Sequence, residues 1–198
     1  MTYRSEYAKI INFIDKSLPT KLTNDQKSLK ITSEGDLQSC TYYHLRKFFR
    51  KVNLNKWHIQ NKLSRVDKKT SKQYPDIVIS WMEGVKPRGN YADILIELKE
   101  TMKFKEDVAD SEIEKLEAMM KNYDSSGVFI YACLDKREGK KVKETNEIME
   151  KMVSKNMKKY MIVKTINIKG KKTFDADMDY FDEKVDILRK YRTVKVKN

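Results

Sequence analysis

The chain has 198 residues, 39% hydrophobic and 36% charged, which suits one domain of ordinary size with its own core. No apolar run approaches a membrane span and the first residues lack a secretory signal, so we expect a cytoplasmic protein of the host cell. Cys40 and Cys133 are too few for a disulfide framework. The net charge of +13 favours a polyanionic partner, with nucleic acid the natural candidate, although a lysine-rich surface without such a partner also explains it.

The first fifty residues predict two helices. Apolar residues at helical spacing up to Leu18, with Pro19 next, predict an amphipathic helix of about four turns, followed by a polar loop over 20–30. Ser33 is a good N-cap for the second helix. The inward stripe of that helix is formed by Leu37, Thr41, Leu45, Phe48 and Phe49. Glu34 falls on this stripe and is expected to face inward, whereas Asp36 points away and is the better capping acid.

The stretch from Tyr74 to Glu100 predicts two adjacent strands joined by a turn, after a first strand over 57–64. Because side chains alternate along a strand, Glu97 and Lys99 project to one face. Ile94, Ile96 and Leu98 project to the other. If the arms pair as a hairpin, Asp76 at the start of one lies close to Glu97 at the end of the other. Two carboxylates held together favour a cation between them, and oxygen ligands suit magnesium.

The second half predicts a helix, a strand and a C-terminal extension. A helix after Glu106 has its apolar side chains on one face, and the strand GVFIYACLD then pairs in parallel with the strand that ends at Lys99. Residues 136–146 form a basic connection. A helix, the strand YMIVKTINIKG and a last helix around 178–188 complete the chain. Without repeats or a low-complexity linker, we expect one domain over 1–198.

Pro75-Asp76 and Glu97-Leu98-Lys99 resemble the signature of the PD-(D/E)XK nuclease superfamily, in sequence and in separation. The triplet of acid, any residue and lysine recurs elsewhere in this lysine-rich chain, but only this copy ends an apolar strand that follows a Pro-Asp strand. The run SEGDLQSCTYYHLRKFF, with the strand after it, resembles the N-terminal nuclease module of type I restriction subunits. The resemblance covers about residues 30–135.

The resemblance implies a fold and a site. The fold is α/β, a restriction-endonuclease-like αβββαβ core with a mixed sheet between helices, plus an N-terminal helix and a C-terminal α-β-α elaboration. The implied ligands of Mg²⁺, for which Mn²⁺ would substitute, are Asp76, Glu97, the carbonyl of Leu98 and the helix acid Glu34, which binds directly or through a water molecule. Lys99 is the implied catalytic amine. Many relatives add a glutamine or lysine from the following helix. Here the matching turn offers Lys115 and Glu117, and whether either contributes is open.

Two functions remain open at this point. The first is a magnesium-dependent endonuclease that hydrolyses DNA phosphodiester bonds, plausibly as a homodimer because cutting both strands takes two sites. The second is a catalytically inactive DNA-binding or assembly protein on the same fold. The basic loop 65–73 is either a solvated connection or a phosphate contact. Asp93, about four residues from the reactive end of its strand, is expected to be structural, and Glu100 points to the opposite face.

A zinc site is the remaining metal hypothesis. Cys40 and His44 are one helical turn apart, and with His58 and Cys133 they would make one set of four ligands. Cys40 lies between polar neighbours on a helix, and Cys133 lies in an apolar strand like a small core residue. The sequence therefore disfavours zinc.

Overall fold

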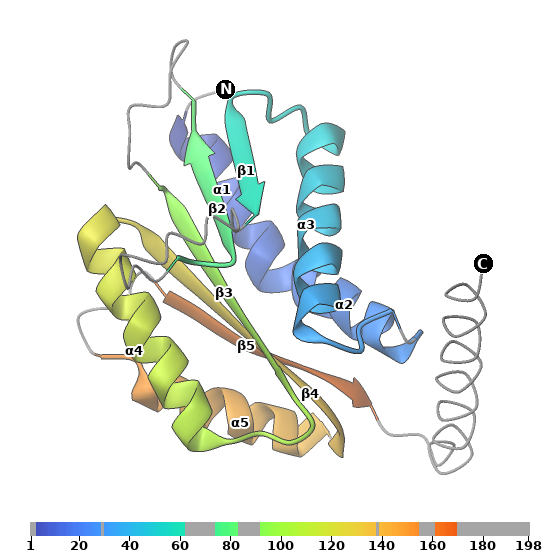
Figure 1. Cartoon of the computed structure of the whole chain (residues 1–198). Coiled ribbons are helices and arrows are strands. Elements are labelled where there is room, and N and C mark those ends of the chain that lie inside the picture. The colour runs from blue at the N-terminus through green and yellow to red at the C-terminus, as the bar shows by residue number, and fades with distance from the viewer. Residues whose placement is uncertain are drawn as a thin grey trace, which may run out of the picture. The chain divides into compact units, whose positions relative to one another are not determined.

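A computed structural model describes residues 3–28, 30–61, 74–82, 92–137, 139–154 and 161–169 (Figure 1). The chain divides into two units, Met1–Ile168 and Lys169–Asn198, and all described elements lie in the first apart from the last residue of β5. The elements are α1 (Tyr3–Asn12), a π-helical turn (Phe13–Ser17), α2 (Leu18–Lys27), α3 (Glu34–Lys51), β1 (Trp57–Asn61), β2 (Ile77–Trp81), β3 (Ile94–Thr101), α4 (Glu106–Tyr123), β4 (Ser126–Arg137), α5 (Gly139–Met152) and β5 (Met161–Lys169).

The strands form a five-stranded mixed sheet in the order β1-β2-β3-β4-β5. β1 with β2 and β2 with β3 are antiparallel, while β3 and β4 are parallel and joined through α4. An α/β fold with a mixed sheet is therefore confirmed, and so is the parallel pairing around α4. From α3 to β4 the elements follow in the order α-β-β-β-α-β.

The two faces of the sheet carry different helices. Ile94, Ile96 and Leu98 of β3 belong to the core under α1, α2 and α3. Leu95 belongs to a second core under α4 and α5. Figure 1 shows α3 and α4 on opposite sides of the sheet. Because side chains alternate, Glu97 and Lys99 leave β3 on the α4 side, as the sequence predicted.

The polar loop predicted over 20–30 is wrong. Residues Leu18–Lys27 form α2, which follows α1 through the π-helical turn. Pro19 lies in the first turn of α2, where a proline is tolerated because the N–H that it lacks has no partner within the helix. Leu22 and Gln26, one turn apart, are buried, and the Gln26 amide donates to the backbone carbonyl of Cys133 at 2.9 Å.

Other predicted boundaries agree more closely. Ser33 caps α3, because its hydroxyl accepts a hydrogen bond from the backbone N–H of Asp36. The basic connection expected over 136–146 is wrong in part, since α5 already begins at Gly139; the lysines and glutamate in this stretch are good helix formers. The strand YMIVKTINIKG is confirmed as β5. The loop 65–73 and the helix around 178–188 lie outside the described residues.

An aromatic cluster of Tyr3, Tyr7, Trp57 and Trp81 joins α1 to β1 and β2. The ring centroids of Tyr3 and Trp57 are 5.5 Å apart, and those of Trp57 and Trp81 are 5.2 Å apart. The indole N–H of Trp57 donates to the buried carboxylate of Glu6 at 3.0 Å. This cluster anchors the first helix to the antiparallel edge of the sheet. None of the helices in the described parts of the chain is both long and apolar enough to cross a bilayer.

Candidate functional site

Asp76 stands at the start of β2, opposite Glu97. The antiparallel register pairs Ile77 with Ile96, so the next position along the ladder places Asp76 across from Glu97. Asp76 is only 5% exposed, and its carboxylate accepts a hydrogen bond from the backbone N–H of Leu98 at 2.9 Å. The hairpin predicted from the sequence therefore brings the Pro-Asp strand against the Glu-Leu-Lys strand.

A residue that the sequence analysis missed fixes the backbone of Asp76. The side-chain amide of Gln38 in α3 donates to the carbonyl oxygen of Asp76 at 2.9 Å. Gln38 follows Glu34 by one helical turn, so the two project from the same side of α3. That spacing was the available signal, because it directs a second polar side chain of α3 toward the site.

The donor set fits magnesium as a site with two carboxylates. Glu97 is half-buried and its Oε2 atom is shielded from solvent. A residue in an extended strand turns its N–H and C=O toward the same neighbour, so we expect the Leu98 carbonyl to face the side on which its N–H meets Asp76. Magnesium commonly takes one or two carboxylates and completes its shell with water and substrate phosphate.

Glu34 contacts Lys99, and it does not face the core as the helical stripe predicted. Its carboxylate lies 2.9 Å from the Lys99 ammonium, with 47% of the Glu34 side chain and 28% of the Lys99 side chain exposed. The prediction was wrong because Glu34 is the first residue of α3, one turn ahead of the first buried residue, Leu37. Across the described ranges, no three Asp, Glu, His or Cys side chains are placed to share a metal ion.

Lys99 is held in its charged form. The hydrogen bond to Glu34 raises the pKa of the Lys99 ammonium, partial burial opposes this, and the negative charges of Glu34, Glu112 and Asp76 raise the pKa further. The sequence had left the direction of this shift open. An ammonium with a raised pKa serves as a fixed positive charge at neutral pH rather than as a proton acceptor.

Glu100 and Glu112 are further acids that the sequence analysis did not place at the site. Burial raises the pKa of the Glu100 carboxyl, and the charge of Glu34 raises it further. Glu112 lies 2.9 Å from Lys115, which answers part of the question about α4: Lys115 forms an ion pair with an acid that acts on Lys99. Glu117 accepts a hydrogen bond from the backbone N–H of Ser154 at 2.7 Å, so it contacts the chain after α5.

Two residues of the zinc hypothesis, His44 and Cys40, lie beside the carboxylate of Asp25. His44 contacts the Asp25 carboxylate at 2.5 Å, and Lys30 approaches the other oxygen of Asp25 at 3.5 Å. Burial raises the pKa of the Cys40 thiol, and the neighbouring Asp25 raises it further, which opposes the thiolate that zinc requires. No cluster that could hold a metal occurs among the described residues.

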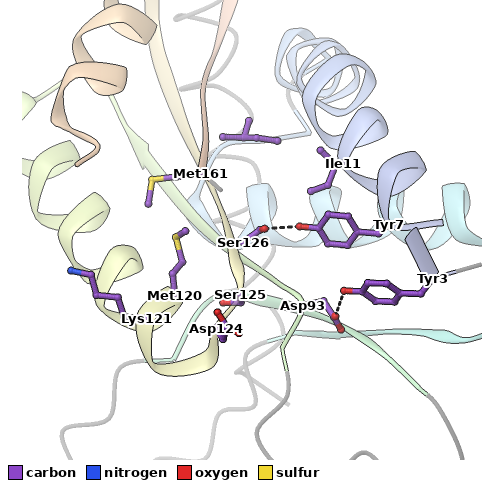
Figure 2. Close-up of a pocket in the computed structure, with 11 residues that line it drawn as sticks. Tyr3, Tyr7, Ile11, Asp93, Met120, Lys121, Asp124, Ser125, Ser126 and Met161 are labelled. Atoms are coloured by element: carbon purple, nitrogen blue, oxygen red, sulfur yellow. Dashed lines mark hydrogen bonds between the residues drawn. The ribbon is translucent and has the colours of Figure 1, made fainter. Parts of the chain in front are cut away.

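A cavity of about 650 Å³ lies at the opposite end of β3, beside Asp93 (Figure 2). The hydroxyl of Tyr3 donates to the Asp93 carboxylate at 2.6 Å, and the hydroxyls of Tyr7 and Ser126 are 2.5 Å apart. Asp93 also accepts from the backbone N–H of Trp81 at 2.6 Å. These hydrogen bonds link α1 to the sheet, which agrees with the expected structural role of Asp93.

Comparisons of the chain with protein-family models, with curated proteins and with solved structures find no match. The case for a function therefore depends on the residues and on their geometry.

Proposed function

We propose that this chain is a magnesium-dependent endonuclease that hydrolyses DNA phosphodiester bonds at a PD-(D/E)XK site. One observation supports this most directly: Asp76 stands opposite Glu97, its carboxylate accepts from the N–H of Leu98, and Lys99 follows on the same strand. The two carboxylates of the nuclease signature thus stand across from each other on β2 and β3, with Lys99 two residues farther along β3, although the chain brings Asp76 and Glu97 from positions more than twenty residues apart.

In this proposal each residue has one task. Asp76, Glu97 and the carbonyl of Leu98 would hold Mg²⁺, which when bound supplies a water of lowered pKa and neutralises phosphate charge. Lys99, kept cationic by Glu34, stabilises the negative charge that develops on the phosphate oxygens. Glu34 positions Lys99, a role that replaces its expected place as a third metal ligand. Gln38 positions Asp76 through the backbone.

The second candidate is a catalytically inactive DNA-binding or assembly protein on the same fold. The contact between Glu34 and Lys99 favours it, because Glu34 engages the lysine instead of joining Asp76 and Glu97 in a group of three acids. The two candidates differ in chemistry. The endonuclease and the DNA-binding form of the second candidate both predict DNA binding, an assembly protein does not, and only the endonuclease predicts cleavage that depends on a divalent ion.

The test uses the full chain with supercoiled and linear DNA, in Mg²⁺ or Mn²⁺ and in chelator. We expect nicking or cutting with either metal and none in chelator, and a large loss of activity in Asp76→Asn or Lys99→Ala. Loss of one transition-state contact of this kind lowers the rate by about 10²- to 10³-fold. Asp110→Asn and Lys121→Ala on α4 are matched controls, since both residues are exposed and Lys121 lines the cavity at the opposite end of β3.

The controls should cut like the wild-type chain, and circular dichroism should show that all four variants fold. Wild-type cleavage that persists in chelator, or full activity in both site variants, would contradict the mechanism. Tight DNA binding with no cleavage in any divalent ion would select the second candidate.

Two further experiments with the full chain test which DNA structure it cuts and whether it acts as a homodimer. A panel of linear duplex, supercoiled, single-stranded, flap and four-way-junction DNA separates restriction from repair, junction resolution and viral processing in one assay. Light scattering during cleavage tests the homodimer, for which we expect double-strand breaks. A monomer that only nicks would limit the proposal to one strand per event.

A further inference from the structure

The outer face of α3 lacks negative charge along most of its length. From Leu37 to Asn61 the chain contains no aspartate or glutamate and five basic residues. These are Arg46, Lys47, Arg50, Lys51 and Lys56, and all five are exposed. No acid within the described ranges forms an ion pair with any of them. Lys56 follows the end of α3 and lies over the ring of Trp81. We call the other four cations, together with Tyr43, the α3 basic face.

On the opposite side of the sheet, α4 has the opposite charge. α4 carries six acids against two lysines, Lys115 and Lys121. The acids are Glu106, Asp107, Asp110, Glu112, Glu114 and Glu117. A polyanion is therefore repelled by the α4 side and attracted to the α3 side, because unpaired surface charges set the potential that a charged partner meets.

Aromatic rings support the cations of the α3 basic face. Tyr43 is 57% exposed, and the Lys47 ammonium lies 5.8 Å from the centre of its ring. The Arg46 guanidinium lies 6.0 Å from the ring centre of Tyr42. At such distances the rings attract the cations weakly and restrict where they point without neutralising them. The charges therefore stay available for phosphate oxygens.

The same helix leads to the candidate site. Its first residue, Glu34, holds Lys99, and Gln38 one turn later holds Asp76. At about 1.5 Å per residue, Arg50 lies roughly 24 Å along the axis from Glu34, a span of about seven base pairs of duplex at 3.4 Å each. At about 100° per residue, Lys47 and Arg50 point away from the side of α3 that carries Gln38, so a duplex on the α3 basic face would lie along the outside of the helix and would not cover the candidate site.

We propose that the α3 basic face is the docking surface for the phosphate backbone of duplex DNA. The inference rests on the proposed function for the identity of its partner and adds where that partner binds. Acidic membranes carry negative charge as well. The α3 basic face, however, has one exposed aromatic ring among four cations and presents no apolar surface for insertion, so we assign it to nucleic acid.

The experiment measures binding of a 20-base-pair duplex by fluorescence anisotropy in chelator, so that no cleavage contributes. We expect Lys47→Glu/Arg50→Glu to weaken binding at least tenfold near 100 mM salt. If the two cations contact two phosphates, the slope of log K against log salt falls by about 1.8 in magnitude. Lys121→Glu/Lys143→Glu, on exposed positions of α4 and α5, changes net charge equally and should bind within about twofold of wild type.

Each outcome decides something. Equal weakening by both double variants would show that net charge alone acts, and unchanged binding of the α3 variant would exclude the surface; either result overturns the inference. If the α3 double variant lost binding to anionic phosphatidylserine vesicles and kept its binding to DNA, the surface would be a membrane-binding surface and the inference would be overturned. Circular dichroism checks that both variants fold. A wild-type chain that binds through α3 but never cuts would refute the proposed function and leave this inference standing.

Discussion

α3 and α4 have the same length, 18 residues, and cover opposite faces of one sheet, yet their outer surfaces differ in sign. Their inner surfaces are alike: Leu37 and Leu45 of α3, and Leu116 of α4, are fully buried. The comparison shows that core packing specifies where a helix lies and leaves its other face unconstrained. A difference between two such outer faces is therefore the better guide to function.

The prediction with the largest expected effect tests whether the buried faces of α3 and α4 contribute equally to stability. Leu45→Ala and Leu116→Ala each remove a side chain that is 0% exposed, so each should lower the free energy of unfolding by about 2–5 kcal/mol. Urea denaturation followed by circular dichroism measures this. Ser39→Ala on α3 and Ser111→Ala on α4, at exposed positions, are the matched controls and should shift it by less than about 0.5 kcal/mol. A negligible loss for either leucine would mean that its helix contributes less to the core beneath it than the other helix does.

The second prediction separates the helices by activity. Gln38→Ala removes a hydrogen bond from α3 to Asp76, and Glu117→Ala removes one from α4 to Ser154. Each should cost about 0.5–1.5 kcal/mol of stability. If the site is catalytic, only Gln38→Ala should slow cleavage, by about tenfold, because only Gln38 positions a site residue. Initial rates of cleavage of supercoiled DNA measure this difference between the two variants. An equal slowing by Glu117→Ala would contradict the positioning role of Gln38.

The third prediction concerns the helix starts. The Ser33 side chain caps α3, whereas Lys105 at the start of α4 forms no side-chain cap. Ser33→Ala should lower stability by about 1 kcal/mol, and Lys105→Asp should raise it by about 0.5 kcal/mol by supplying an acceptor near the helix amides. Thermal melts of the two variants should shift in opposite directions. Shifts of the same sign would show that the caps do not limit these helices.

The smallest expected effect is the pH dependence of the α3 start. Hydrogen bonds from Thr32 and Ser33 hold the pKa of Asp36 below its ordinary value of 3.8. Because the folded pKa is lowered, Asp36 contributes stability above pH 3.8 and loses it as the pH falls through the lowered pKa. Asp36→Asn should therefore cost about 0.5 kcal/mol at pH 7, after solvent screening, and almost nothing near pH 2. A constant difference across that range would contradict the assignment.

The sequence predicted the strands well because alternation and burial there reinforce one another. Asp76, Glu97 and Lys99 could be placed together from the pairing of two apolar strands alone. The orientation of Glu34 was harder to predict. Helical spacing puts it on the inward stripe but does not reveal that burial along α3 begins only at Leu37. Gln38 was missed because it donates to the backbone carbonyl of Asp76. Every residue has such a carbonyl, so the sequence does not show which one a side chain will contact.

Pro19 shows a different limit. A proline ends one helix or begins another, and only the buried positions one turn apart, Leu18 and Leu22, distinguish the two cases. Glu112 was missed because the charge that Lys99 feels depends on neighbours from other elements, whereas Glu100 lies on the face of β3 opposite Lys99, as predicted. Charge interactions between side chains of different elements can be identified only when the fold is known.

Both tryptophans of the chain, Trp57 and Trp81, belong to the cluster that includes Tyr3 and Tyr7. Their emission spectrum will therefore report the docking of the amino-terminal helix on β1 and β2, and will report little of the core under α4 and α5. An unfolding curve recorded by intrinsic fluorescence should be read as a local signal from that corner. If it precedes the curve from far-ultraviolet ellipticity, the corner melts as an early, separate step.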